Sequence, residues 1–444
     1  MILSTIACLG RHTITGLMCT SSNQFADWTT FYRLFSQQRI NQDAIFNVVR
    51  CELLGHLKDD QPVVAAIDDT IVRKTGRRTP GVSYRRDPLG PAFQTNFVRA
   101  QRFLQLSAAL PAGAATRMIP VDFQHAPTPD KPRKDASFEQ HAEYRELAQQ
   151  ANLSRVAARR LQVLRDEIDK TDSARHLVIV GDGGYTNRNV LRGLPPNTTF
   201  IGRIRSDAKL YAPFEASDTG PGRNRRYGDR APTPDQLRID DTQPWQDVKA
   251  TISGTGHALR VKSLSPVLWK TAGYEIPLRL IVVAPTPYRL RKGSKLLYRQ
   301  PAHLITTDLQ TPVEEIVQWY IWRTDIEVNF RDEKQNFGLG QAQVRNRQSV
   351  QAAPALAVAA YSMLLLSAAR AYGVGGKPAT LPPPKWMQGR DKPRASTNDL
   401  RQALRHELWA RGISNFSGFA YQPSTGPMPS KLLLPMASAA LYAN

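Results

Sequence analysis

Two short apolar runs that each end in an aspartate place the strongest constraint on the fold of this chain. The first, PVVAAIDDT, spans residues 62–70, and the second, HLVIVGDGGY, spans residues 176–185. Such β-branched apolar runs are typical of buried strands, which here would carry acids to their C-terminal edges. Glycines on both sides of Asp182 allow a tight turn and the close approach of a metal or a phosphate. An exposed turn is the alternative for the first run, and a helix-capping aspartate is the alternative for the second.

A charged segment later in the chain, VQWYIWRTDIEVNFRDEKQNFG at residues 317–338, predicts a helix with one unusual face. At about 100° per residue, four of its side chains fall within roughly 60° of one another. These are Tyr320, Arg323, Glu327 and Lys334. One carboxylate among three phosphate-binding donors suits a phosphodiester-cutting site. A surface helix with ordinary ion pairs is the alternative.

The spacing Tyr-x2-Arg-x3-Glu-x6-Lys resembles, without a gap, the signature of the YREK group of bacterial insertion-sequence transposases. That group belongs to the DDE transposases. The resemblance implies an α/β fold with a ribonuclease H-like core, in which a mixed sheet packs with helices. It also implies a β-rich insertion, an N-terminal helical region, and two divalent metal ions, Mg²⁺ with Mn²⁺ as an alternative.

The resemblance also implies roles for individual residues. The expected catalytic residues and metal ligands are Asp68, Asp182 and Glu327. The family's first acid stands in an Asp-x-Ser/Thr motif on the first core strand, which matches Asp68 and Thr70. Asp69 is the alternative first ligand, because neighbouring residues on a strand point to opposite faces. The residues expected to hold DNA phosphates are Tyr320, Arg323 and Lys334.

The charge balance favours a polyanionic partner. The chain has 59 Lys and Arg against 38 Asp and Glu, a formal net charge of +21. Such a surplus attracts nucleic acid, although a merely basic protein would show it too. The candidate DNA-binding residues are Lys74, Arg77 and Arg78 in a loop, Arg203 and Arg205 on a later strand, and Trp245 and Trp269 in the β-rich stretch. In the family a tryptophan of the insertion can stack on a flipped base, but core tryptophans are commoner.

The composition along the chain and the resemblance together predict five segments. Residues 1–60 form an N-terminal helical region, in which Asp27 can cap a helix and which in the family helps to bind transposon ends. Residues 61–207 and 301–372 form the two parts of the catalytic core, separated by a β-rich insertion at 208–300. Residues 373–444 form a C-terminal region, which in the family can pair two subunits.

The sequence predicts a cytoplasmic protein that does not enter a membrane. Its three cysteines show no zinc-binding spacing, which fits a reducing compartment. The first residues, MILSTIACLGRH, lack a signal-peptide pattern. The longest apolar stretch, residues 355–369, is short for a membrane span and is expected to form a buried helix.

These observations predict a cut-and-paste DNA transposase of a bacterial insertion sequence. It would act as a homodimer on double-stranded DNA, cutting the transposon ends and joining them to a target. One alternative is a two-metal DNA endonuclease that cuts without strand transfer. The other is a non-catalytic DNA-binding protein derived from a transposase, against which the complete set of acids counts.

Overall fold

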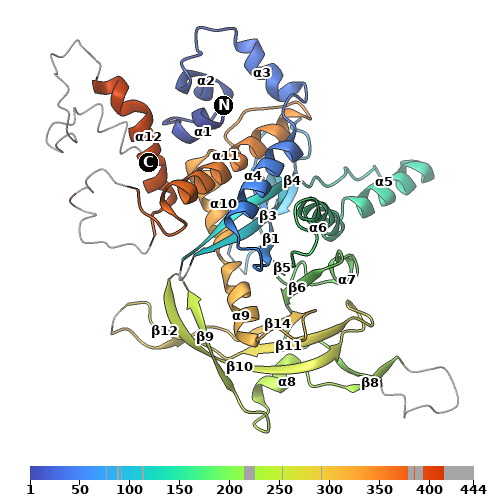
Figure 1. Cartoon of the computed structure of the whole chain (residues 1–444). Helices are drawn as coiled ribbons and strands as arrows, with labels where there is room; N and C mark the ends of the chain where they lie inside the picture. Colours follow the sequence, from blue (N-terminus) through green and yellow to red (C-terminus); the bar gives the residue numbers. More distant parts are fainter. Residues whose placement is uncertain are drawn as a thin grey trace.

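One large mixed sheet with helices on both of its faces organises the computed structural model (Figure 1). The structure describes residues 1–76, 78–87, 90–91, 93–112, 115–214, 226–252, 254–291, 293–378, 385 and 394–414. The sheet lies at the centre, so residues far apart in the sequence meet along its strands.

Four helices precede the first strand. They are α1 (Ile2–Ala7), α2 (Ile14–Thr20), α3 (Trp28–Ser36) and α4 (Gln42–His56). Each of the last three begins after a residue whose side chain accepts a hydrogen bond from a first-turn amide, and these residues are Thr13, Asp27 and Asn41. Such caps satisfy amides that the helix leaves unpaired. The prediction that Asp27 caps a helix is confirmed.

Six strands form the part of the sheet that carries the candidate site. They are β1 (Val63–Arg73), β2 (Ser83–Arg86), β3 (Phe97–Ala112), β4 (Ala115–His125), β5 (Leu177–Gly181) and β6 (Thr198–Arg203). β4, β3 and β1 are antiparallel neighbours, whereas β1, β5 and β6 run parallel. Ala65 and Ile67 pack in a different apolar cluster from Val64 and Ala66. Because β1 is buried on both faces, its first half is continuously apolar.

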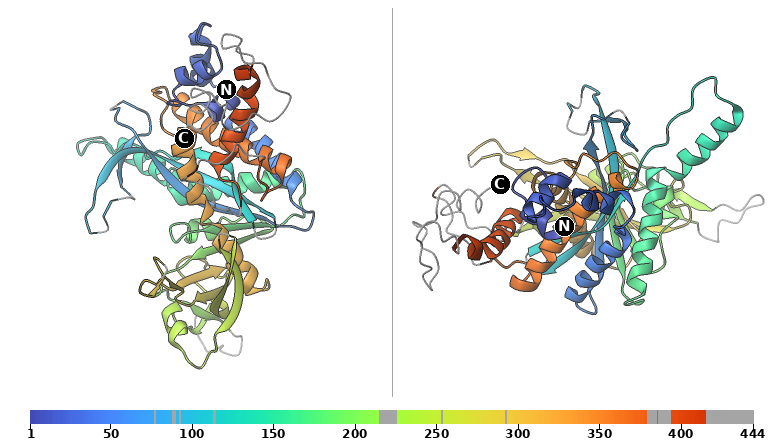
Figure 2. Two further views of the ribbon diagram at one scale, coloured as in Figure 1. Left: turned by 90° about the vertical axis from the view of Figure 1, so that its left-hand side faces the viewer. Right: turned by 90° about the horizontal axis from the view of Figure 1, so that it is seen from above.

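Three helices connect these strands. α5 (Phe138–Gln150) and α6 (Leu153–Asp169) lie between β4 and β5, and α7 (Arg188–Leu191) lies between β5 and β6. α6 packs on the sheet through Leu161, Leu164 and other apolar side chains. α5 has no buried residue and projects from the body of the protein (Figure 2).

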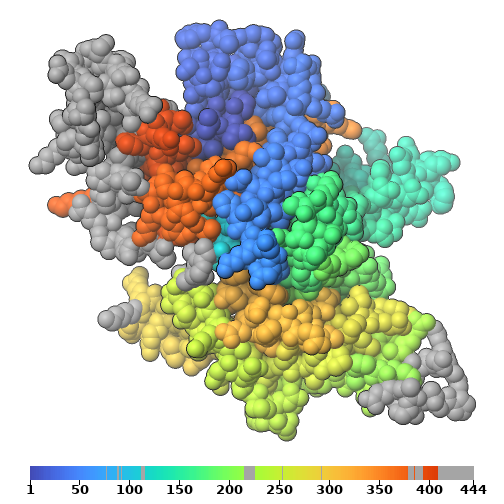
Figure 3. Space-filling view, in the orientation of Figure 1, coloured from blue at the N-terminus to red at the C-terminus, as the bar shows by residue number. Residues whose placement is uncertain are grey.

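The strands that follow residue 208 extend the same sheet. Their bounds, with those of one helix, are β7 (Tyr211–Pro213), β8 (Tyr227–Arg230), α8 (Pro234–Ile239), β9 (Gln246–Ile252), β10 (Thr255–Leu268), β11 (Pro277–Val283) and β14 (Ala302–Thr306). β14 pairs with β6 on one side and with β11 on the other, and β10 follows β11. A small separate sheet joins β12 (Pro287–Tyr288) to β13 (Leu297–Tyr298). The β-rich stretch therefore forms a broad layer beneath the helices (Figure 3).

The segment 317–338 forms parts of two helices and not the single helix that its periodicity predicts. α9 (Val313–Trp322) ends before Arg323, and α10 (Asp325–Asn336) begins after Thr324. At the junction the amide of Thr324 donates to the carbonyl of Ile321, and the amide of Ile326 donates to that of Arg323. The Thr324 hydroxyl also donates to the Ile321 carbonyl, at 2.8 Å. These shorter bonds replace the α-helical pattern, so the four-residue stripe is interrupted.

Two further helices close the described part of the chain. α11 (Ser349–Tyr372) is long and apolar enough to cross a membrane, but 83% of its apolar window is buried within the protein. It packs against β4, α4 and α1, as a core helix does. α12 (Thr397–Ser414) buries Arg401 and Arg405, which donate hydrogen bonds to the carbonyls of Ile6, Ala7 and Cys8 around the end of α1.

Candidate active site

Asp68 and Asp182 lie side by side because of the register between two parallel strands. Ile67 of β1 pairs with Gly181 of β5, and the two aspartates are the next residues along the chain. Neighbouring strands are about 4.8 Å apart, so the two acids lie close together where the parallel pairing of β1 and β5 ends. β6 pairs with β5 in the same way, and its next residue after this pairing is Arg203.

The turn after β5 holds Asp182. The amide of Gly184 donates to Asp182 Oδ1 at 2.8 Å, and the Thr186 hydroxyl donates to the main-chain oxygen of Asp182 at 2.9 Å. The residue that caps α7 is Asn187, so Asp182 does not cap the following helix. Of the described hydrogen bonds, only that from Gly184 reaches the Asp182 carboxylate, which leaves Oδ2 available to another partner.

Asp68 is a largely buried carboxylate that the rest of the site surrounds. The amide of Asp69 donates to Asp68 Oδ1 at 2.8 Å, and Arg323 Nη1 lies 3.4 Å from Asp68 Oδ2. Burial raises the pKa of Asp68 to about 7, and the charge of Asp182 adds to this effect. The Asp69 amide and the Arg323 guanidinium oppose the increase but do not overcome it.

Asp69 is held by a different set of groups. The Tyr185 hydroxyl donates to Asp69 Oδ1 at 2.9 Å, and Tyr185 is only 2% exposed. Burial raises the pKa of Asp69, whereas the Tyr185 hydrogen bond and the charges of Arg102 and Arg85 lower it. Tyr185 packs in the same cluster as Ile67, on the face of β1 opposite to that of Ala66. Asp69 therefore accepts a hydrogen bond from a buried tyrosine, which Asp68 does not.

Arg323 lies at the junction of α9 and α10, where it faces β1. Its side chain is 12% exposed, and its guanidinium carbon lies 5.7 Å from the centre of the Tyr320 ring. Glu327 follows in the first turn of α10 and is exposed. Lys334 lies in the last turn, where partial burial lowers its pKa. The structure thus brings Arg323 to Asp68, while none of the described contacts joins Glu327 to either aspartate.

The aspartate pair has the chemistry of a divalent-cation site. Two adjacent carboxylates repel each other unless a cation lies between them, and carboxylate oxygens are the ligands that Mg²⁺ prefers. Within the part of the chain that the structure describes, no three His, Cys, Asp or Glu side chains are close enough together to hold a metal ion. Asp68 and Asp182 are therefore a candidate pair of cation ligands, and Glu327 makes no described contact with either of them.

Comparison with known families now adds an independent finding. A sequence model of the family described as DDE superfamily endonuclease matches residues 1–273, which include both aspartates. The chain belongs to the DDE superfamily endonucleases. A DDE endonuclease is a nuclease or a transposase that acts on DNA, and the superfamily typically uses divalent metals. The mixed α/β sheet is compatible with a DDE nuclease fold. No curated protein matches the chain.

The basic loop after β1 in this DDE endonuclease has both structural and exposed cations. Lys74 Nζ donates to the main-chain oxygens of Gly340 and Ala342, at 2.7 and 3.0 Å. It thereby fastens the segment after α10 to the end of β1. Arg78 is exposed, and Arg77 lies outside the described residues.

The two arginines predicted on the later strand differ in their surroundings. Arg203 is the last residue of β6, is exposed, and follows the residue paired with Gly181, so it lies next to Asp182 at the sheet edge. Arg205 forms an exposed ion pair with Asp207, with Nε 2.9 Å from Oδ1. Arg203 is therefore better placed than Arg205 to contact a phosphate near the aspartates.

Both candidate tryptophans are half-buried. The Lys262 ammonium lies 4.6 Å from the centre of the Trp245 ring, and the Arg260 guanidinium lies 5.6 Å from it. Trp269 packs against two separate clusters of buried apolar side chains. Each indole therefore has packing partners within the DDE endonuclease, and a base would have to displace some of them.

Two residues near the site escaped the sequence analysis. Tyr185 ends the second aspartate run, and its position soon after Asp182 was the available signal. Glu333 is 0% exposed although its helix is strongly charged, and burial raises its pKa to about 8, with Gln105 and Lys334 opposing this. Helical periodicity gave no signal for Glu333, because a glutamate among charged neighbours is normally a surface residue.

Proposed function

We propose that this DDE endonuclease is a DNA transposase of the YREK group, which cuts transposon ends and joins them to a target. The observation that carries the proposal is the register of β1 and β5, which sets Asp68 beside Asp182. Arg323 adds to it, because the signature arginine contacts the first of the two acids.

The strand arrangement supports the ribonuclease H-like part of the proposal. The order β4, β3, β1, β5 and β6 begins with antiparallel strands and ends with parallel ones. The first aspartate lies on the central strand of these five, and the second ends its parallel neighbour. The resemblance implies that the first acid stands on the first core strand, and β1 is the first strand of the chain.

The contacts of the two neighbouring acids favour Asp68 as the first ligand. Asp68 contacts Arg323 at the start of the helix that carries Glu327. Asp69 is instead engaged by Tyr185. Its backbone amide nevertheless orients Asp68 by donating to Oδ1. Asp68 Oδ2 and Asp182 Oδ2 are then the oxygens left for a cation.

Asp68, Asp182 and Glu327 would hold two divalent metals. When bound, the metals activate the attacking oxygen and stabilise the leaving oxygen in an in-line displacement. Glu327 must approach the aspartates for this, and the α9–α10 junction is the place where the helix can adjust, because its hydrogen bonds are already non-helical.

The basic side chains of the segment would position the DNA. Arg323 would exchange its contact with Asp68 for a phosphate, to which a guanidinium can donate two parallel hydrogen bonds. Lys334 and Tyr320 would hold neighbouring phosphate oxygens. No protein nucleophile is required, since water cuts the strand and the freed 3′-hydroxyl then attacks the target.

The proposal extends to the rest of the chain. The helices of residues 1–60 would bind transposon ends, residues 208–300 would form the insertion, and residues 373–444 would help to pair two subunits. The two parts of the catalytic core would be residues 61–207 and 301–372. The protein would act as a homodimer in the bacterial cytoplasm.

The test is an assay of cutting and joining with the element's own end sequences, a target plasmid, and Mg²⁺ or Mn²⁺. We expect both cut ends and joined products, and we expect Glu327→Gln to lose both while still binding DNA. Cut ends without joined products would identify a two-metal endonuclease instead. DNA binding without either product would identify a non-catalytic protein.

A further inference from the structure

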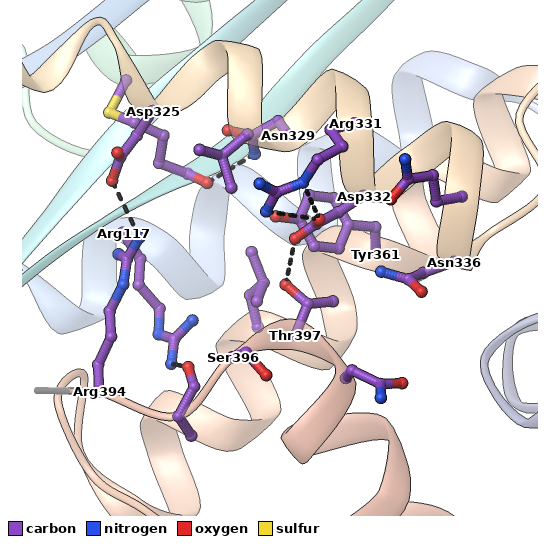
Figure 4. A pocket seen from close by; sticks show the side chains of 16 residues that line it. Arg117, Asp325, Asn329, Arg331, Asp332, Asn336, Tyr361, Arg394, Ser396 and Thr397 are labelled. Carbon is purple, nitrogen blue, oxygen red and sulfur yellow. Dashed lines mark hydrogen bonds and ion pairs between the residues drawn. The ribbon is translucent and has the colours of Figure 1, made fainter. Parts of the chain in front are cut away.

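A polar cavity lies on the side of α10 that faces away from Glu327. It is partly open to solvent, has a volume of about 690 Å³, and is lined by residues of α10, β4, α11 and the segment that leads into α12 (Figure 4). Asn329 and Asp332 line it, and on a helix they lie roughly 140–160° from Glu327. Glu327 does not line the cavity, although Arg331, which does, lies only about 40° from Glu327 on the helix, so α10 contributes to both sites.

The cavity has a surplus of positive charge. Its charged side chains are Arg117, Arg331, Arg394, Asp325 and Asp332. Arg331 pairs with Asp332 at 3.1 Å, and Arg394 pairs with Asp325 at 3.2 Å. None of the ion pairs in the described part of the chain involves Arg117, whose Nε and Nη2 donate to two main-chain carbonyls instead. Arg117 is instead attracted by the nearby charges of Asp325 and Asp332 without pairing with either, and the charged side chains of the cavity carry one positive charge in excess.

Arg117 keeps an unused donor within reach of the cavity. Arg117 is only 6% exposed, yet its Nη1 makes no described hydrogen bond and is not among the atoms that are completely buried. Arg117 is one of the residues that line the cavity. Burial and the nearby charge of Arg394 lower the pKa of Arg117 to about 10. An anion bound between the two guanidiniums would relieve this repulsion.

We propose that this cavity binds a small organic phosphate of nucleotide size. Its phosphate would lie against Arg117 and Arg394, because guanidiniums bind phosphate oxygens through charge-assisted hydrogen bonds. Asn329 Nδ2 donates to the Met118 carbonyl at 2.8 Å, so the Asn329 side-chain oxygen and the Gln335 amide would hydrogen-bond the rest of the molecule. A volume of 690 Å³ is within the range of small-molecule sites and is too large for phosphate alone. This site is independent of the DNA chemistry proposed for the opposite face of α10.

The methyl group of Met118 offers a local reporter. Met118 lines the cavity, is 3% exposed, and is one of seven methionines. The full-length protein labelled with ¹³C at the methionine methyl groups would be titrated with ADP, with adenosine and with inorganic phosphate. We expect ADP to shift the Met118 signal in a saturable way, adenosine to act only at higher concentration, and phosphate to compete with ADP. The Met118 signal is assigned with Met118→Leu.

Two variants distinguish ADP binding in this cavity from non-specific attraction of ADP to a basic protein. Arg117→Leu should weaken ADP binding about tenfold or more, the usual effect of losing a hydrogen bond to a charged group. Because Arg117 also anchors two carbonyls, the milder Gln335→Glu places a negative charge at an exposed position on the cavity wall. Its control is Gln310→Glu, an exposed position with the same change in net charge.

The ADP titrations of these variants decide whether the cavity is a binding site. Weaker ADP binding in Gln335→Glu, with unchanged binding in Gln310→Glu, supports the site. Equal weakening in both variants, or an unchanged Met118 signal at saturating ADP, overturns it.

Discussion

Arg323 Nη1 and Asp68 Oδ2 lie 3.4 Å apart, although 255 positions separate the two residues in the chain. The contact joins the α9–α10 junction to β1. It places a fixed positive charge at the oxygen where a metal is proposed to bind. In the proposed mechanism the guanidinium would leave Asp68 when metal and DNA bind.

Replacing Arg323 tests whether its guanidinium leaves Asp68 to bind a DNA phosphate. We expect Arg323→Gln to slow DNA cleavage about 10- to 100-fold, because one charge-assisted contact to a phosphate is lost. Arg323→Lys should restore little, since an ammonium cannot donate two parallel bonds. Single-turnover cleavage rates at saturating DNA would measure both effects. Full activity of Arg323→Lys would show that only the charge matters.

Asp68→Asn and Asp69→Asn form a matched pair. Both changes remove one carboxylate and preserve its shape. We expect Asp68→Asn to abolish cleavage and metal binding, whereas Asp69→Asn should retain cleavage within about tenfold, because a hydrogen bond from Tyr185 remains possible. Calorimetric titration with Mn²⁺ and cleavage assays would be run on both. The reverse result would make Asp69 the ligand.

The pKa of Asp68 predicts how metal binding depends on pH. Since that pKa is raised to about 7, the carboxyl group is mostly protonated below pH 7 and must lose its proton before it binds a cation. Mg²⁺ affinity should therefore rise up to about tenfold per pH unit below pH 7 and level off above it. Titrations at several pH values between 5.5 and 8.5 would test this. Asp69→Asn should keep the profile, and a flat profile in the unmodified protein would contradict it.

Glu333 predicts how stability depends on pH. Its pKa is raised from 4.5 to about 8 in the folded protein, so between these values the folded state holds a proton that the unfolded state has lost. Stability should consequently fall as pH rises from 4.5 to 8, by up to about 1.4 kcal/mol per pH unit. Glu333→Gln should flatten this dependence in urea unfolding measured from pH 5 to 8. A slope unchanged by the substitution would rule out Glu333 as its source.

Tyr185→Phe tests whether the Tyr185 hydrogen bond to Asp69 supports the site. The phenol fixes Asp69, whose amide in turn donates to Asp68. We expect the variant to bind Mn²⁺ about 3- to 10-fold more weakly, as the loss of one such hydrogen bond implies. A purely structural role would lower the unfolding temperature and leave the Mn²⁺ affinity of the folded protein unchanged.

Local patterns predicted much of the fold but not how its parts meet. The apolar runs before Asp68 and Asp182 predicted two strands, because burial on both faces requires continuous apolar residues. The parallel pairing of Ile67 with Gly181 joins residues more than a hundred positions apart, and nothing local encodes it. Periodicity also missed the helix break, since the Thr324 hydroxyl competes with the backbone for the Ile321 carbonyl.

In the candidate site, too, the sequence indicated residue types but not the distant residues that they contact. Lys74 was predicted to contact DNA from its place in a basic loop, yet two carbonyls after α10 engage it. Those partners are distant in sequence, so charge alone could not distinguish a phosphate ligand from a structural cation. Trp245 and Trp269 pose the same problem, because an indole suits a core and a base equally well.

Arg401 and Arg405 fasten the last described helix to the carbonyls at the end of the first. During synthesis, α1 leaves the ribosome almost four hundred residues before these partners exist. The end of α1 therefore lacks its hydrogen bonds from α12 until translation is nearly finished. Premature termination anywhere before α12 would leave the carbonyls at the end of α1 without these donors.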